Sequence, residues 1–295
     1  MTVSGALSHS SADARSATPL PALAALSARY RADPRFACLL KAYCSTMTEA
    51  PEGAWPFAKL FNQFARYMVC YMLIHNYYAW RLGGGPPPTL AVLQRSVPSS
   101  PRQAAGFIAA LKAGRLVEAM AMPEDRRTKL LRPEEAVIRA VGRSGFGFIV
   151  AAEHLEGRGA PLAERLAAQP EALGELLYRS AAFVRAHGTL IDPFPRILTF
   201  ARRDCGYLVL CAVMGAHYES AAEHAPSLSL KALAERFRIS PAHVGNLLQE
   251  AQGEGWFRIG PRGRLKEMDH GLVDEFERWA SWQMAHYRTL AATLA

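Results

Sequence analysis

The sequence matches itself at a shift of 140 residues, and this internal repeat constrains the fold more than any other feature. The shift places Tyr67 on Tyr207, and the register then holds over a long stretch of apolar and hydroxyl positions. Further pairs in the same register are Val69 and Val209, Leu93 and Leu233, Val97 and Phe237, and Ser100-Pro101 and Ser240-Pro241. A chain of 295 residues, half of them apolar, can bury two moderate cores. We therefore expect two copies of one structural unit.

Each copy predicts the same order of elements. A long apolar helix (residues 64–81 and 204–219) precedes a short helix with a hydroxyl N-cap, Thr89 or Ser229. A second short helix begins at Ser-Pro, where proline suits the first helical position because no N–H is needed there. A short apolar run suited to a strand (116–118 and 256–258) then leads into a basic loop (123–129 and 261–266). This order of elements is that of a winged helix-turn-helix.

The positive charge is concentrated in these two segments. The whole chain has a net charge of +8. Residues 89–132 contain eight basic and three acidic residues, and residues 229–266 contain seven and three, which gives +5 and +4. Fields of this kind favour a polyanionic partner, and the fold pattern makes that partner double-stranded DNA.

Several other classes of protein are disfavoured. The longest candidate for a membrane span, residues 64–80, is interrupted by Arg66 and His75, so we expect no membrane association. Residues 1–21 are rich in Ser, Ala and Thr and lack the basic start of a secretory signal, and we expect a disordered tail there. There is no P-loop, G-x-S-x-G, H-E-x-x-H or metal-ligand spacing, so we predict no enzyme, no catalytic residue, no metal site and no cofactor.

The cysteines indicate a cytoplasmic location. They are odd in number, never form a C-x-x-C pair, and lie in apolar helical stretches: Cys38, Cys44, Cys70, Cys205 and Cys211. We interpret them as buried thiols in a reducing compartment, with a redox sensor as the alternative.

The first copy resembles the MarR-type transcriptional regulators. The resemblance lies in Gly114-Arg115-Leu116-Val117-Glu118, followed by Pro123-Glu124-Asp125-Arg126-Arg127-Thr128-Lys129-Leu130, which is similar to a wing of that family. The second copy is similar only in outline, because its wing, residues 260–264, is shorter and lacks the acidic residue, and Arg115 stands where the family usually has glycine. Family members are usually homodimers of chains about as long as this repeat. The resemblance therefore implies two fused subunits.

The expected fold is mainly α with small β-wings, in which two winged helix-turn-helix modules in tandem are joined by a helical pseudo-dimer core. We divide the chain into a tail (1–21), a first module with N-terminal helices (22–135), a helical linker and pseudo-dimerisation region (136–200), and a second module with a C-terminal helix (201–295). Residues 20–48, 134–156 and 161–187, helical by apolar periodicity, supply the shared core. Whether the protein is a monomeric pseudo-dimer or a homodimer stays open.

The expected mechanism places each second short helix in the major groove, with its N-terminal residues at the base edges. The candidates for base contacts are Ser99, Ser100, Arg102, Gln103, Gly106, Ser240, Ala242, His243 and Asn246. Arg102 suits a guanine and Gln103 an adenine. The wing candidates for phosphate or minor-groove contacts are Arg126, Arg127, Lys129, Arg262, Arg264 and Lys266. Because the candidate base-contacting residues differ between the two copies, we expect an asymmetric pair of half-sites.

Two alternative functions and an effector site are kept as hypotheses beside the transcriptional regulator. Plasmid-type replication initiators also pair two winged helices in one chain, and a winged-helix protein-interaction scaffold is a third hypothesis. The family resemblance implies a small-molecule effector in a cleft near Tyr67, His75, Tyr78 and Trp80, although aromatic residues on a central helix are more often core residues.

Overall fold

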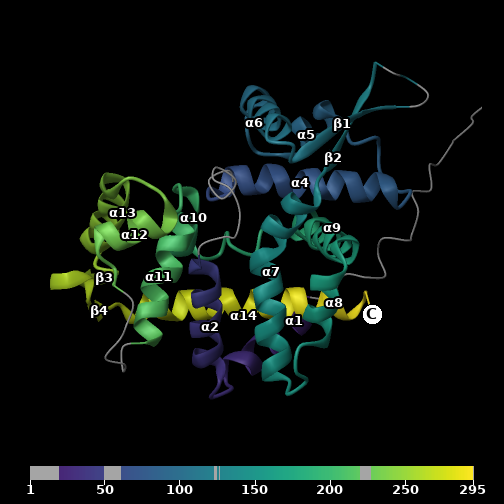
Figure 1. The fold of residues 1–295 in the computed structure, drawn as a ribbon. Coiled ribbons are helices and arrows are strands. Elements are labelled where there is room, and N and C mark those ends of the chain that lie inside the picture. Colours follow the sequence, from purple (N-terminus) through teal and green to yellow (C-terminus); the bar gives the residue numbers. More distant parts are fainter. Residues whose placement is uncertain (1–19, 50–60, 123–124, 126, 220–226, 295) are drawn as a thin grey trace, which may run out of the picture.

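The computed structural model describes residues 20–49, 61–122, 125, 127–219 and 227–294. Within these residues the protein is mainly helical and carries two small antiparallel sheets of two strands each (Figure 1). This confirms the mainly α fold class with small β-hairpins. The predicted tail lies outside the described residues up to residue 19, but Leu20 and Pro21 already belong to the first helix. Proline is tolerated there because a first turn has free N–H groups in any case.

The elements of the two halves follow one another in a similar order. The first half contains α1 (Leu20–Arg31), α2 (Phe36–Thr48), α4 (Phe64–Arg81), α5 (Leu90–Ser96), α6 (Pro101–Ala113), β1 (Val117–Ala121), β2 (Lys129–Pro133) and α7 (Glu135–Leu155). The second half contains α8 (Pro161–Ala168), α9 (Pro170–His187), α10 (Pro195–Arg202), α11 (Gly206–Tyr218), α12 (Leu230–Phe237), α13 (Pro241–Gly253), β3 (Phe257–Ile259), the short 3₁₀ helix η2 (Pro261–Gly263), β4 (Leu265–Met268) and α14 (His270–Ala292).

The two predicted hydroxyl N-caps are confirmed. The hydroxyl of Thr89 accepts a hydrogen bond from the backbone N–H of Val92, and that of Ser229 accepts one from Ala232. Ser100 caps α6 and Ser240 caps α13 in the same way, each followed by proline at the first helical position. A cap is worth about 1 kcal/mol. These residues therefore fix where both short helices of each half begin.

The long helices pack in a pattern that is preserved when the two halves are exchanged. Helices α7 and α14 pack against each other in the centre. In this exchange α4 corresponds to α11, α7 to α14, α8 to α1 and α9 to α2. Helix α4 packs on α9, and α11 packs on α2. In the same way α7 contacts α2 and α14 contacts α9, while α8 contacts α7 and α1 contacts α14. Helices α1 and α2, which the sequence places in the first module, thus contact α14 and α11 of the second half. Each half contributes helices to the other, and one buried core runs through both.

The turn after the second short helix has a left-handed residue in both halves. It is Arg115 (φ 55°) after α6 and Gly255 (φ 73°), at the equivalent position, after α13. This backbone region costs a side-chain-bearing residue roughly 1–2 kcal/mol. Arg115 therefore adopts the left-handed conformation that Gly255 has after α13, and the turn after α6 is kept although its residue is an arginine.

The cysteine prediction is wrong for one residue of the five. Cys44, Cys70, Cys205 and Cys211 are buried, but Cys38 is exposed. Helix α2 buries Phe36 and Leu40, and Cys38 lies about 200° around the helix from Phe36, on the outer face. Among the described helices, none combines the length and apolar character that crossing a membrane requires.

Candidate nucleic-acid interface

Two compact units stand out from the helical core. We call residues 89–133 (α5, α6, β1, β2) the first head and residues 229–268 (α12, α13, β3, β4) the second head. The first head lies at the top of Figure 1 and the second at its left. Helix α4 packs on α5 and β2, and α11 contacts β4. The heads therefore occupy neighbouring corners of the molecule, each supported by one long helix of the core.

Helix α6 presents a polar N-terminal turn to solvent. Ala104, Ile108 and Leu111 are buried, whereas Arg102 and Gly106 are exposed. Two more of the predicted residues, Ser100 and Gln103, are exposed and Ser99 is half-buried, so the structure brings all five together at the start of the helix.

The capping of α6 restricts what Gln103 can contact. Its Oε1 accepts hydrogen bonds from the backbone N–H of Ser100, at 3.2 Å, and from the Ser100 hydroxyl, at 3.0 Å. Only its Nε2 is left for a further contact in this conformation. A two-pronged contact of Gln103 with adenine needs both amide atoms and therefore requires the cap to open.

Helix α13 presents a less polar turn. Val244, Leu247 and Leu248 are buried, and of the predicted residues Ser240, Ala242 and Asn246 are exposed. His243 is half-buried, and its Nε2 lies 2.7 Å from the backbone oxygen of Asp204, to which it donates. This partner is 39 residues away in the chain, and no local sequence signal indicated it.

The two hairpins differ in shape. In the first, β1 and β2 pair over five positions, and the carboxylate of Asp125 accepts from the Arg127 backbone N–H and the Thr128 hydroxyl. These hydrogen bonds hold the pKa of Asp125 below its usual range. Arg127 and Lys129 are exposed, and Arg126 lies outside the described residues.

The second hairpin is shorter and packs against the segment before α12. The backbone N–H of Leu228 donates to the Gly263 oxygen at 2.8 Å, and a Cβ at Gly263 would lie 2.2 Å from the Ser229 nitrogen. Only glycine fits this close approach at a φ of 71°. The three predicted wing cations, Arg262, Arg264 and Lys266, are exposed.

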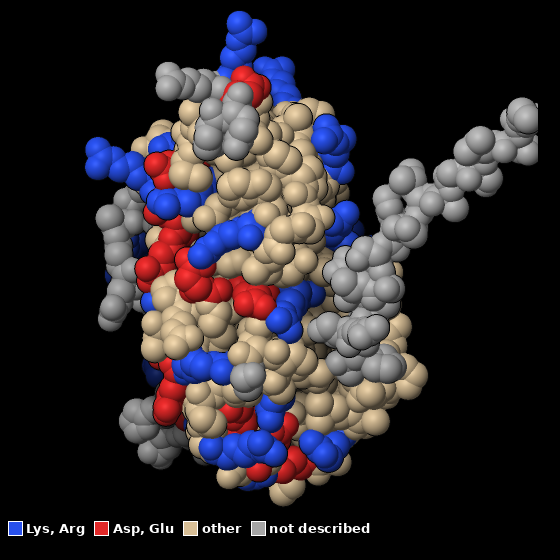
Figure 2. All heavy atoms as spheres, turned by 90° about the vertical axis from the view of Figure 1, so that its right-hand side faces the viewer, with Lys and Arg blue, Asp and Glu red and all other residues tan. Residues whose placement is uncertain are grey.

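Two further basic residues of the heads, Arg132 and Arg258, are paired within the hairpins. Arg132 of β2 binds Glu118 of β1 across the first hairpin at 2.9 Å, and Arg258 of β3 binds Glu267 of β4 across the second. Each hairpin thus has one cross-strand ion pair, but the basic residue lies on the second strand of the first hairpin and on the first strand of the second. Figure 2 shows the side of the molecule that is on the right in Figure 1. Basic side chains project from its upper end, where the first head lies, and acidic side chains gather below them, from the left edge of the view to its centre.

A cavity of about 830 Å³ lies among α2, α4, α7, α9 and α14. Of the four residues predicted near an effector cleft, only Tyr67 lines it. The ring of His75 is buried against Asn76, and the hydroxyl of Tyr78 donates to Glu171 at 3.0 Å. Trp80 is half-buried and contacts Tyr77. The cavity is therefore displaced along α4 from the predicted cleft, towards the start of that helix.

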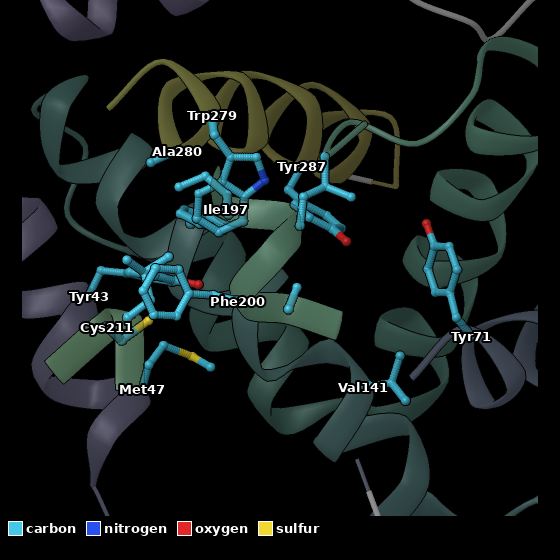
Figure 3. Packing of buried hydrophobic residues seen from close by; sticks show 14 of the residues in the cluster. Tyr43, Met47, Tyr71, Val141, Ile197, Phe200, Cys211, Trp279, Ala280 and Tyr287 are labelled. Carbon is cyan, nitrogen blue, oxygen red and sulfur yellow. The ribbon is translucent and has the colours of Figure 1, made fainter. Parts of the chain in front are cut away.

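The cavity wall contains both paired and unpaired polar atoms. The Tyr71 hydroxyl donates to Ser180 Oγ at 2.6 Å, and Ser180 Oγ lies 2.7 Å from His286 Nε2. Trp279 Nε1 and Thr189 Oγ1 are buried and have no hydrogen-bond partner within the described part of the chain. Figure 3 shows the Trp279 ring nitrogen on the side of Tyr287. A bound group that accepts hydrogen bonds would satisfy Trp279, because an unpaired buried donor is costly. Across the described residues, no His, Cys, Asp and Glu side chains gather into a group that could hold a metal ion.

Burial of His286 predicts a pH-dependent loss of stability. Desolvation lowers its pKa from 6.5 to about 3, so below pH 6.5 the unfolded chain takes up a proton that the folded chain does not. The contribution of His286 to the free energy of unfolding is fully present above pH 6.5 and decreases by about 1.4 kcal/mol for each pH unit below it. Between pH 7 and pH 5, urea unfolding of the wild type should lose about 2 kcal/mol more than that of His286→Gln. Equal losses in the two proteins would contradict a buried, neutral histidine.

Comparison with known proteins adds no relative: no family model, no curated protein and no solved structure matches this chain.

Proposed function

We propose that the protein is a sequence-specific, double-stranded DNA-binding transcriptional regulator, in which the heads are two winged helix-turn-helix units fused into a covalent pseudo-dimer. The observation that carries the proposal is that the head occurs twice. Each copy is a pair of capped helices followed by a basic antiparallel hairpin, and the same helical core supports both copies. A helix of this size fits the major groove, and hairpin cations fit the phosphate backbone beside it.

The exchange of helices between the halves supports the pseudo-dimer. Two heads on flexible linkers would sample many separations, whereas α2 and α9 each pack on the long helix that supports the opposite head. The core thus sets the spacing of the heads. DNA-binding dimers of this kind bind half-sites one helical turn apart, about 34–36 Å.

Salt-dependent binding of the full chain to duplex DNA tests the proposal. Fluorescence anisotropy with a random-sequence duplex should show an affinity that falls steeply as salt rises from 50 to 200 mM, because each neutralised phosphate contributes about 0.9 to the slope of log K against log salt. The double variant Arg127→Ala/Lys129→Ala should lower that slope by about 2. A matched control, Arg29→Ala/Arg158→Ala, removes the same charge at exposed positions away from the heads and should leave the slope unchanged.

Two outcomes would favour the alternatives. Binding that is absent, or that does not depend on salt, would contradict the proposal and favour the protein-interaction scaffold. Binding that requires several direct repeats of an origin, with no response at a single pair of half-sites, would favour the replication initiator.

A further inference from the structure

The two helices expected in the major groove carry opposite charge. Helix α6 and the turn after it, residues 101–115, contain three basic residues and no acidic one: Arg102, Lys112 and Arg115. The equivalent residues 241–255 contain no lysine or arginine and two acidic residues, Glu250 and Glu254. A helix lying between two phosphate backbones is attracted when it is basic and repelled when it is acidic. Helix α13 therefore lacks the attraction to phosphates that α6 has, and Glu254 adds a repulsive charge at its end.

Helix α13 is also fixed to the core by its own polar residues. Both carboxylate oxygens of Glu250 accept from Arg203 Nη2, at 2.6 and 2.7 Å, and His243 donates to the Asp204 backbone. Arg203 and Asp204 form the turn between α10 and α11, and the next residue, Cys205, donates its N–H to the Asn62 oxygen at 2.9 Å. Two polar side chains of α13 are thus used to hold the second head in place.

The first head lacks these two attachments. The residue equivalent to His243 is Gln103, which belongs to the cap of α6, and the residue equivalent to Glu250 is Ala110, which has no polar group. At the position of Arg102, the guanidinium that suits guanine, α13 has Ala242. The chemistry for recognising a base is therefore concentrated on α6.

We infer that the heads divide the work: α6 of the first head recognises bases through Arg102, and the second head is a sequence-independent anchor that binds phosphates through Arg262 and Arg264 of its hairpin. This inference rests on the proposed DNA-binding function. It assigns a site of one recognised half and one unspecified half, about one helical turn away. The exposed hairpin cations supply affinity without discrimination, as contacts to phosphates do.

Selection of bound duplexes from a random library, with the full chain, tests the division. The wild type should enrich one run of conserved bases containing guanine. Arg102→Ala should lose that preference, a change of roughly 10- to 100-fold in discrimination, and still bind DNA. Lys112→Ala, which removes the same charge at the other end of α6, should keep the enriched sequence. Arg262→Ala/Arg264→Ala should keep it too and weaken binding to all sequences equally.

The outcomes separate the inference from the proposed function. Two conserved runs one helical turn apart, of which one survives Arg102→Ala, would overturn the division of work and leave the DNA-binding function standing. A change of the enriched sequence in the Arg262→Ala/Arg264→Ala variant would overturn it as well. If no variant and no wild type binds duplex DNA while thermal melting shows them folded, the proposed function fails, and the inference fails with it.

Discussion

Gly206→Ala is expected to lower the free energy of unfolding by about 3 kcal/mol or more, because the first residue of α11 has no room for a side chain. A Cβ built there would lie 2.0 Å from the Phe200 backbone oxygen and 3.0 Å from the Arg203 Cβ. The first of these contacts is with backbone, so relief requires the whole turn between α10 and α11 to move. That turn is where Arg203 and Asp204 hold α13. Urea unfolding followed by circular dichroism measures the loss.

Gly215→Ala, in the same helix, is the matched control. Its Cβ would lie 3.4 Å from the Cys44 Cβ, an ordinary contact, and alanine is favoured over glycine inside a helix by up to about 1 kcal/mol. This variant should be as stable as the wild type or more stable. Unfolding of both glycine variants at the same urea concentration would show that the turn between α10 and α11 has room for a side chain at residue 206.

Local features of the fold were predicted well from the sequence because their causes are local. Residues 64–81 form α4 with the predicted bounds, since the helix is marked by its own apolar composition and by the glycines that follow it. The caps at Thr89 and Ser229 were predicted for the same reason, because a hydroxyl and the N–H group from which it accepts lie within three residues.

Features that depend on distant contacts were not predicted. The packing of α2 on α11 joins residues more than 150 positions apart, and apolar periodicity shows only that each helix has a buried face, not which helix covers it. Helix α10 crosses the predicted boundary between the linker and the second module at residue 200 and was not singled out, although the turn that follows it holds α13. His243 illustrates the consequence for the site. Its sequence position suits a base contact, whereas its ring bonds the Asp204 backbone.

The cavity contains one residue of the effector cleft that the family resemblance implied. That residue is Tyr67, and its equivalent in the second copy, Tyr207, lines the cavity as well. The polar atoms without partners, on Trp279 and Thr189, come from α14 and from the loop before α10. Their meeting point is a property of the packed core, so composition and spacing could not indicate it.

Glu153→Gln is expected to destabilise the fold by about 3 kcal/mol, because a fully buried carboxylate of α7 caps the neighbouring helix. Glu153 is 0% exposed, and its two oxygens accept from the backbone N–H groups of Leu162 and Ala163, each at 3.0 Å. These N–H groups begin α8, whose own N-cap, Ala160, has no side chain that accepts a hydrogen bond. Glutamine loses the charge that favours a helix N-terminus and turns one acceptor into a donor facing a donor.

Glu164→Gln is the matched control, since it makes the same chemical change at an exposed residue of the first turn of α8. It should change stability by no more than about 0.5 kcal/mol. Hydrogen exchange gives a second measurement, in which the amides of Leu162 and Ala163 should lose protection in Glu153→Gln only. Because Leu166 and Ala167 of α8 line the cavity, release of this helix also loosens the cavity wall. Equal unfolding curves for the two variants would show that Glu153 does not hold α8 against α7.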